Sequence, residues 1–264
     1  MTLTNARRFA PPVAMIMAAV MVASVLGGCA SSGAPPRAAD PTRSETAAAY
    51  NLQLGVAYLQ QGNLALAKDK LERALAQNAR DPNVHGALAM LNEKLGKLPD
   101  ADKHYRTALK LSPRNPDLTN NYAVFLCRTG RVEDGVKRFM DAARNPLYQA
   151  PWRAYTNAGV CLRSANRLDE AAVSFGRSLR IRPNDAEALF QLADLELGRG
   201  RAPASRELLD RYLLTFPATP DLLWLGVRTA RAQGDRLAEE RFLRRLQRDF
   251  PDSEQTRESR GARP

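Results

Sequence analysis

Histidine and cysteine are scarce in this sequence, and this scarcity limits the chemical sites that it can build. The 264 residues include two histidines and three cysteines. His85 and His104 have no partner at the spacing of a zinc site, so we expect no metal centre. Phosphate-binding loops of the form GxxxxGKS/T and nucleophile elbows of the form GxSxG are also missing. We therefore expect no enzyme activity, no cofactor and no small-molecule substrate.

Aromatic residues and dense basic clusters, which nucleic-acid-binding surfaces need, are rare as well. Aromatics make up 6% of the chain, and the formal net charge of +11 is spread out, with no block of five like charges. Hydrophobic residues at 44% and charged residues at 25% are ordinary values for a globular protein. We expect a folded protein without a nucleic-acid partner.

An uncharged apolar run near the amino terminus has the features of an export signal. The run 13–25 follows two arginines and is too short to cross a membrane. It leads into Leu-Gly-Gly-Cys, which ends at Cys29 and resembles a bacterial lipobox. The resemblance implies that residues 1–28 are a signal peptide and that Cys29 receives acyl chains such as palmitate. An uncleaved amino-terminal anchor is the alternative.

The residues that follow Cys29 bear on sorting and on chain flexibility. Ala30 occupies the position where an Asp would resemble an inner-membrane retention signal, so the resemblance implies the outer membrane, facing the periplasm. Residues 29–47 contain few large apolar side chains and are expected to form a flexible tether. A polar tail is expected over 254–264.

A repeat of 34 residues organises the rest of the chain. Its register is set by glycines and one asparagine, residues that tolerate a left-handed turn: Gly62, Gly96, Gly130, Asn166, Gly200 and Gly234. The spacings are 34, 34, 36, 34 and 34 residues, so two extra residues follow the third unit. The predicted units are 48–81, 82–115, 116–151, 152–185, 186–219 and 220–253.

Small and large residues recur at fixed places within the units. Small residues stand seven positions before and five positions after most turns, as at Gly159 and Ala171, which lets two antiparallel helices touch. A large apolar residue stands nine positions after each turn, at Leu71, Tyr105, Phe139, Phe175, Leu209 and Leu243. Val227 and Glu239 break the small-residue pattern in the sixth unit, as suits a terminal cap.

This pattern resembles the tetratricopeptide repeat (TPR). The resemblance implies an all-α fold, a right-handed superhelix of six helix-turn-helix units. The first helix of each unit is expected to line an inner groove that binds a segment of a partner protein.

Two sets of residues are predicted to line this groove. Leu52, Val56 and Leu59 form an apolar stripe on the first helix, unless the tether or a capping helix covers them. Asn121 and Asn157 recur at one position and can hold a partner's backbone, whereas the alternative is that they satisfy neighbouring helix ends. Arg128 and Arg163 lie nearby and can bind carboxylates.

Four stretches narrow the resemblance to one family. They are NNYAVFLC at 120–127, NPLY at 145–148, NAGVCL at 157–162 and LWLG at 223–226. Together with the lipobox and the insertion, they resemble the PilF/PilW lipoproteins of type IV pilus biogenesis. The resemblance implies a pilotin that binds the pilus secretin and promotes its localisation and multimerisation. A periplasmic scaffold for peptidoglycan synthesis or outer-membrane protein assembly is the alternative.

Cys127 and Cys161 are the two cysteines that remain if Cys29 is acylated. They lie at positions 12 and 10 of adjacent units, on first helices that pack side by side. An oxidising compartment favours a disulfide between them. Separate burial of two small apolar side chains is the alternative.

Overall fold

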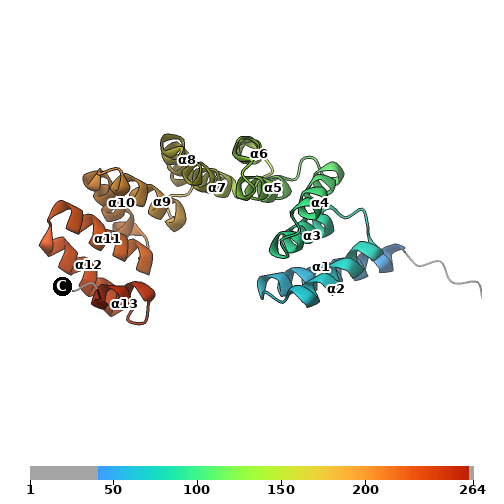
Figure 1. Cartoon of the computed structure of the whole chain (residues 1–264), viewed down its shortest axis with the longest axis horizontal. Coiled ribbons are helices and arrows are strands. Elements are labelled where there is room, and N and C mark those ends of the chain that lie inside the picture. The colour runs from blue at the N-terminus through green and yellow to red at the C-terminus, as the bar shows by residue number, and fades with distance from the viewer. Residues whose placement is uncertain (1–40, 262–264) are drawn as a thin grey trace, which may run out of the picture. The chain divides into compact units, whose positions relative to one another are not determined.

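The computed structural model describes residues 41–261, and every regular element in that range is a helix. Cys29 and Ala30, with the predicted signal peptide, lie outside the described residues. Helices that follow one another in sequence pack in pairs, and the first helices of these pairs lie on the inner side of the curve that the unit Asp40–Pro264 describes (Figure 1). This arrangement confirms the predicted all-α TPR superhelix. Within 41–261, no helix combines the length and apolar character needed to cross a bilayer.

Six helix pairs and one closing helix make up this range. The pairs are α1 (Pro41–Gln60) with α2 (Leu64–Gln77), α3 (Pro82–Lys94) with α4 (Leu98–Leu111), α5 (Pro116–Arg128) with α6 (Val132–Arg144), α7 (Pro151–Ser164) with α8 (Leu168–Ile181), α9 (Ala186–Gly198) with α10 (Ala202–Thr215), and α11 (Pro220–Gln233) with α12 (Arg236–Asp249). Helix α13 (Glu254–Gly261) follows.

The turns inside the pairs have the predicted conformation. All five register glycines have positive φ, between 69° and 81°, and Asn166, with φ 59°, is the single non-glycine residue with positive φ in the described range. The left-handed residue lets the chain reverse and satisfies the last carbonyls of the first helix, as when Arg167 N–H donates to the Leu162 carbonyl. The regular spacing of these residues therefore reflects the same left-handed turn in all six units.

Side-chain caps and prolines mark where several units begin. The side chains of Asp81, Asn115, Asp185 and Thr219 accept hydrogen bonds from the first turns of α3, α5, α9 and α11. Proline then starts three of these helices, α3, α5 and α11, where a missing N–H costs nothing. The predicted unit boundaries agree with these starts to within one residue.

Small-to-large contacts join the two helices of a pair. A Cβ on Gly159 of α7 would lie 2.5 Å from the ring of Phe175 on α8, and Gly55 meets Leu71 in the same way. In the last pair the contact is shifted by one residue. Gly226 lies against Phe242, and Ala238 is buried where Glu239 was expected. Helix α11 extends to Gln233, directly before its turn, which accounts for the shift.

Both ends of the repeat array hold more helix than the sequence suggested. Helix α1 begins at Pro41, inside the segment 29–47 that was expected to be a tether, and the Ser44 hydroxyl donates to the Gln77 carbonyl at 2.9 Å. At the other end, residues 254–261 form α13 rather than a polar tail. The Thr256 hydroxyl is buried and donates to the Phe250 carbonyl at 2.8 Å. At each end a short polar side chain secures the extra helix through a hydrogen bond, which hydropathy does not reveal.

The insertion between the third and fourth units is held by hydrogen bonds and by one buried aromatic ring. Asn145 donates from its side chain to the Arg114 carbonyl at 2.9 Å and accepts from the Leu147 N–H at 2.9 Å. Tyr148 is 6% exposed and belongs to a core that the third and fourth units share. The two extra residues thus place one aromatic ring in the core.

The small-residue contact predicts opposite effects for two glycines. Gly159→Ala should destabilise the protein by about 1 to 3 kcal/mol, because the new methyl group overlaps the Phe175 ring. A Cβ on Gly176, in α8, would meet no atom within 4 Å, so Gly176→Ala should stabilise the protein by about 0.5 to 1 kcal/mol. Chemical unfolding measures both, and equal effects of the two substitutions would contradict the packing described.

The two histidines form a hydrogen-bonded pair between α3 and α4, called the histidine clasp below. His85 Nε2 lies 3.0 Å from the Ala79 carbonyl, which can only accept, so Nε2 carries the proton. His85 Nδ1 therefore accepts from His104 Nδ1, 3.0 Å away. Burial, and then the electrostatic interaction with His85, lower the pKa of His104 below its usual value of 6.5.

This clasp predicts a loss of stability on acidification. Because the pKa of His104 is lower in the folded chain than in the unfolded chain, the unfolded chain binds more protons as the pH falls below about 6.5. The urea midpoint should therefore fall between about pH 7 and pH 5.5, and His104→Gln should flatten this dependence. An equal slope in the variant would show that the clasp does not titrate in this window.

Candidate partner-binding groove

The first helices of the units present one register position along the inner side. Position nine of the six units holds Val56, Met90, Val124, Val160, Asp194 and Arg228. Met90 is 41% exposed and Val160 is 37% exposed, whereas Val56 and Val124 are half-buried. This register position is therefore apolar in the first four units and charged in the last two.

The stripe predicted on the first helix is largely core. Leu59 is 3% exposed and packs with Leu71 and Leu88, so it contacts its own unit and the next one rather than a groove. Leu52 and Val56 are partly buried against the same core. The three residues lie on one face of the helix, as their i, i+4, i+7 spacing indicates. At Leu59 this face packs against the second unit instead of facing the groove.

The predicted asparagines interact within the chain. Asn157 of α7 donates to Asn120 of α5 at 3.1 Å, and Asn120 donates weakly to Asn121 at 3.5 Å. Sequence reasoning selected Asn121 and missed Asn120, which is 4% exposed and joins the two units. A half-buried Asn157 keeps a second amide hydrogen that this bond does not use.

Arg163 belongs to an ionic ladder that crosses three units. Its guanidinium contacts Asp194 at 2.5 Å and donates to the Gln191 side chain at 2.6 Å. Arg228 of α11 contacts the other oxygen of Asp194 at 2.9 Å. Arg163 is therefore already paired on the inner side and has less freedom to bind a partner's carboxylate than expected.

Arg128 is far less constrained. Its side chain is 73% exposed, and its ion pair with Glu93 has an N···O distance of 3.7 Å. Glu93 also accepts a hydrogen bond from the Tyr105 hydroxyl, and burial raises the pKa of Tyr105 well above its usual range. Glu93 is only 15% exposed, but a long ion pair to an exposed arginine contributes little, so Arg128 can exchange it for another carboxylate.

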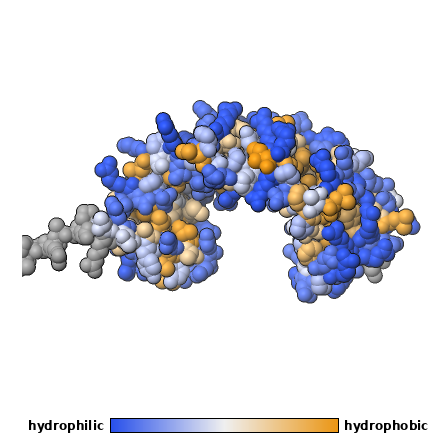
Figure 2. Space-filling view, turned by 180° about the vertical axis from the view of Figure 1, so that it is seen from behind, coloured by the Kyte–Doolittle hydropathy of each residue, from blue (hydrophilic) through white to orange (hydrophobic). Residues whose placement is uncertain are grey.

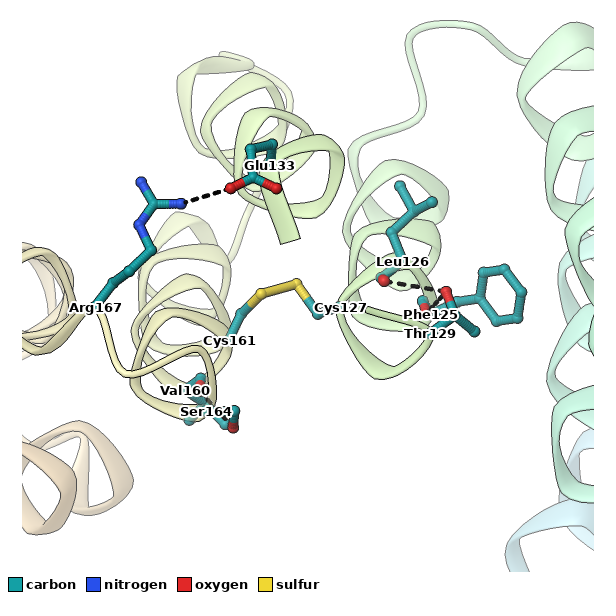
Figure 3. Close-up of a disulfide and its surroundings, with 9 residues drawn as sticks. All are labelled: Phe125, Leu126, Cys127, Thr129, Glu133, Val160, Cys161, Ser164 and Arg167. Atoms are coloured by element: carbon teal, nitrogen blue, oxygen red, sulfur yellow. Dashed lines mark hydrogen bonds and ion pairs between the residues drawn. A yellow bond between two sulfur atoms is a disulfide. The ribbon is translucent and has the colours of Figure 1, made fainter. Parts of the chain in front are cut away.

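A disulfide joins the third and fourth units beside Arg128. Cys127 of α5 and Cys161 of α7 are bonded, with Cα atoms 5.7 Å apart (Figure 3). A second link runs parallel to it, since Arg167 contacts Glu133 at 3.3 Å. Val160 and Ser164 lie on the same helix as Cys161. The two units are thereby held together next to the groove.

A pocket of about 470 Å³ opens beside this disulfide. Its walls come from α5, α6 and α7 and their turns, and its lining residues are Val124, Cys127, Arg128, Gly130, Val132, Phe139, Asn157, Val160, Cys161, Ser164 and Ala165. Three predicted groups, Arg128, Asn157 and the cysteine pair, meet here. Val124 and Val160 were missed, although their shared position in adjacent units could have identified them.

The face of the molecule in Figure 2 is mostly hydrophilic with separate apolar patches. In the part of the chain that the structure describes, no group of three or more His, Cys, Asp or Glu side chains is placed to hold a metal ion. The arrangement can therefore bind a segment of a protein through apolar contact, one weakly paired cation and amide groups.

Comparisons with known proteins agree with this architecture. Models of the tetratricopeptide repeat match residues 52–116, 87–151, 128–186 and 162–225. The type IV pilus assembly protein PilF of Pseudomonas aeruginosa is 31% identical over 234 residues, 88% of this chain and 92% of that protein. A solved structure of P. aeruginosa PilF matches 84% of this chain and all of its own, at 28% identity and a TM-score of 0.66.

A second solved structure is that of PilW, described as a widely conserved type IV pilus biogenesis factor. It matches 80% of this chain and 97% of its own, with 26% identity and a TM-score of 0.67. Both similarities extend over nearly the whole of the known proteins. They therefore concern the complete repeat array rather than one repeat.

The disulfide should contribute measurably to the free energy of unfolding. Closing a loop of 34 residues should contribute about 3 to 4 kcal/mol by restricting the unfolded chain. A Cys127→Ser, Cys161→Ser double variant should lose this amount in chemical unfolding, and the reduced wild-type protein should behave like the variant. Alkylation and mass spectrometry of unreduced protein from the periplasm should find neither thiol free; two free thiols would refute the bond.

Proposed function

This chain belongs to the PilF/PilW-type family of tetratricopeptide repeat proteins, and on that premise we propose that it is an outer-membrane lipoprotein of type IV pilus biogenesis. In this proposal the inner groove binds the pilus secretin and promotes its localisation and its multimerisation. Similarity over 92% of the length of PilF supports the proposal more than any single feature.

The groove supports a binding role on physical grounds. Exposed apolar side chains such as Met90 and Val160 gain free energy when a partner removes them from water. Helix α7, which carries Val160, is fixed by links to both neighbouring units, through the Asn157 to Asn120 hydrogen bond and the Arg163 contact with Asp194. A groove fixed in advance loses little entropy when it binds.

The anchor completes the proposal. Acylated Cys29 holds the protein on the periplasmic face of the outer membrane, and Ala30 permits sorting away from the inner membrane. Because helix α1 begins at Pro41, the linker between the lipid and the first helix is shorter than the segment 29–47. The groove is then held close to the membrane in which a secretin channel assembles.

The test is complementation of a strain that lacks the gene. The wild-type protein should restore surface pili and heat-resistant secretin multimers, and it should fractionate with the outer membrane. Cys29→Ser should abolish this location and reduce multimers severely, and Ala30→Asp should move the protein to the inner membrane.

Two outcomes would contradict the proposal. Unchanged pili and secretin multimers in the deletion strain would exclude a role in pilus assembly. Co-purification of the wild-type protein with peptidoglycan-synthesis or outer-membrane assembly proteins, and not with the secretin, would favour the alternative scaffold function. A matched variant, Ala39→Ser, keeps the lipobox and position 30 intact and should behave like the wild type.

A further inference from the structure

We propose that the pocket beside the disulfide is a specificity site that receives a bulky apolar side chain of a partner protein whose neighbouring residue carries a carboxylate. This inference rests on the proposed function, because it assumes a protein segment in the groove. It adds the chemistry by which that segment is recognised.

The shape of the pocket suits one large side chain. Its volume of about 470 Å³ lies within the range of small-ligand sites. Phe139 is 1% exposed and forms part of its wall, while Val160 is 37% exposed at the inner side. A bulky apolar group that enters here buries its own surface and that of Val160 together.

The charges around the pocket select a carboxylate. Arg128 is the one charged residue in its lining. Of the two acidic residues in the first turn of α6, Glu133 contacts Arg167, and Asp134 lines a different pocket. Glu93 reaches Arg128 only at 3.7 Å. A partner's carboxylate can therefore form a charge-assisted, bidentate pair with Arg128 without competing with an acid in the lining.

Polar groups near the pocket can hold the backbone of the same segment. Asn157 uses one amide hydrogen for Asn120, which leaves a second for a carbonyl of the partner. The Ser164 hydroxyl donates to the Val160 carbonyl and can still accept from an N–H group. Protein segments supply carbonyl and N–H groups next to their side chains, so these contacts favour a peptide over a free anion.

The disulfide makes this site rigid. It connects α5 and α7, the two first helices that form the walls, and both of its sulfurs belong to lining residues. The walls therefore keep their separation when the pocket is empty, and a partner binds without ordering them.

Photocrosslinking in cells tests the inference with the full lipoprotein. A benzophenone amino acid at Ser164, an exposed lining position, should crosslink to the partner, whereas one at Val173, 54% exposed on α8, should not. Mass spectrometry should identify a secretin peptide in which a bulky apolar residue adjoins Asp or Glu. Arg128→Glu should reduce the Ser164 crosslink about tenfold, and Arg128→Lys should retain more of it.

The controls separate this inference from the proposed function. Arg180→Glu makes the same change of charge on α8 and should leave the crosslink unchanged; circular dichroism should show equal melting of all variants. The pocket inference is overturned if the secretin co-purifies but Ser164 gives no crosslink, the peptide lacks a carboxylate, or Arg128→Glu has no effect. If a peptide of the expected chemistry comes from another protein and no secretin co-purifies, the pocket inference holds and the proposed function fails.

Discussion

The rest of this structure depends on the close approach of the two helices in each pair. A small residue of one helix makes this approach possible by leaving room for a large apolar residue of the other. Gly159 against Phe175 shows it most directly, because no other residue leaves room for the ring. Each pair buries its large side chains between its own helices. The inner face of the first helix therefore takes no part in the packing within the pair.

That inner face is used in two ways. Part of it links neighbouring units, through the Asn157 to Asn120 hydrogen bond, the ladder around Asp194 and the disulfide. Met90, Val160 and Arg128 remain exposed among these links. Because the linked residues fix the spacing of the helices, the exposed residues have defined positions, and recognition needs little rearrangement.

Sequence periodicity predicted the six units and the left-handed turns well, since a turn that requires positive φ admits few residues. It predicted the groove less well. Leu59 lies in the core and Arg163 is paired with Asp194, because contacts between units depend on side chains that lie far apart in the sequence. The pocket could not be predicted, because three helices form it. Helix α13 was missed because buried hydroxyl groups, rather than apolar side chains, secure it.

Hydrogen–deuterium exchange of the lipoprotein, alone and with the purified pilus secretin, tests the central claim most directly. If the inner side of the third and fourth units holds the partner, exchange should slow in α5 and α7 when the secretin is present. Slower exchange confined to the outer helices α6 and α8, or unchanged exchange in a complex that demonstrably forms, would contradict it.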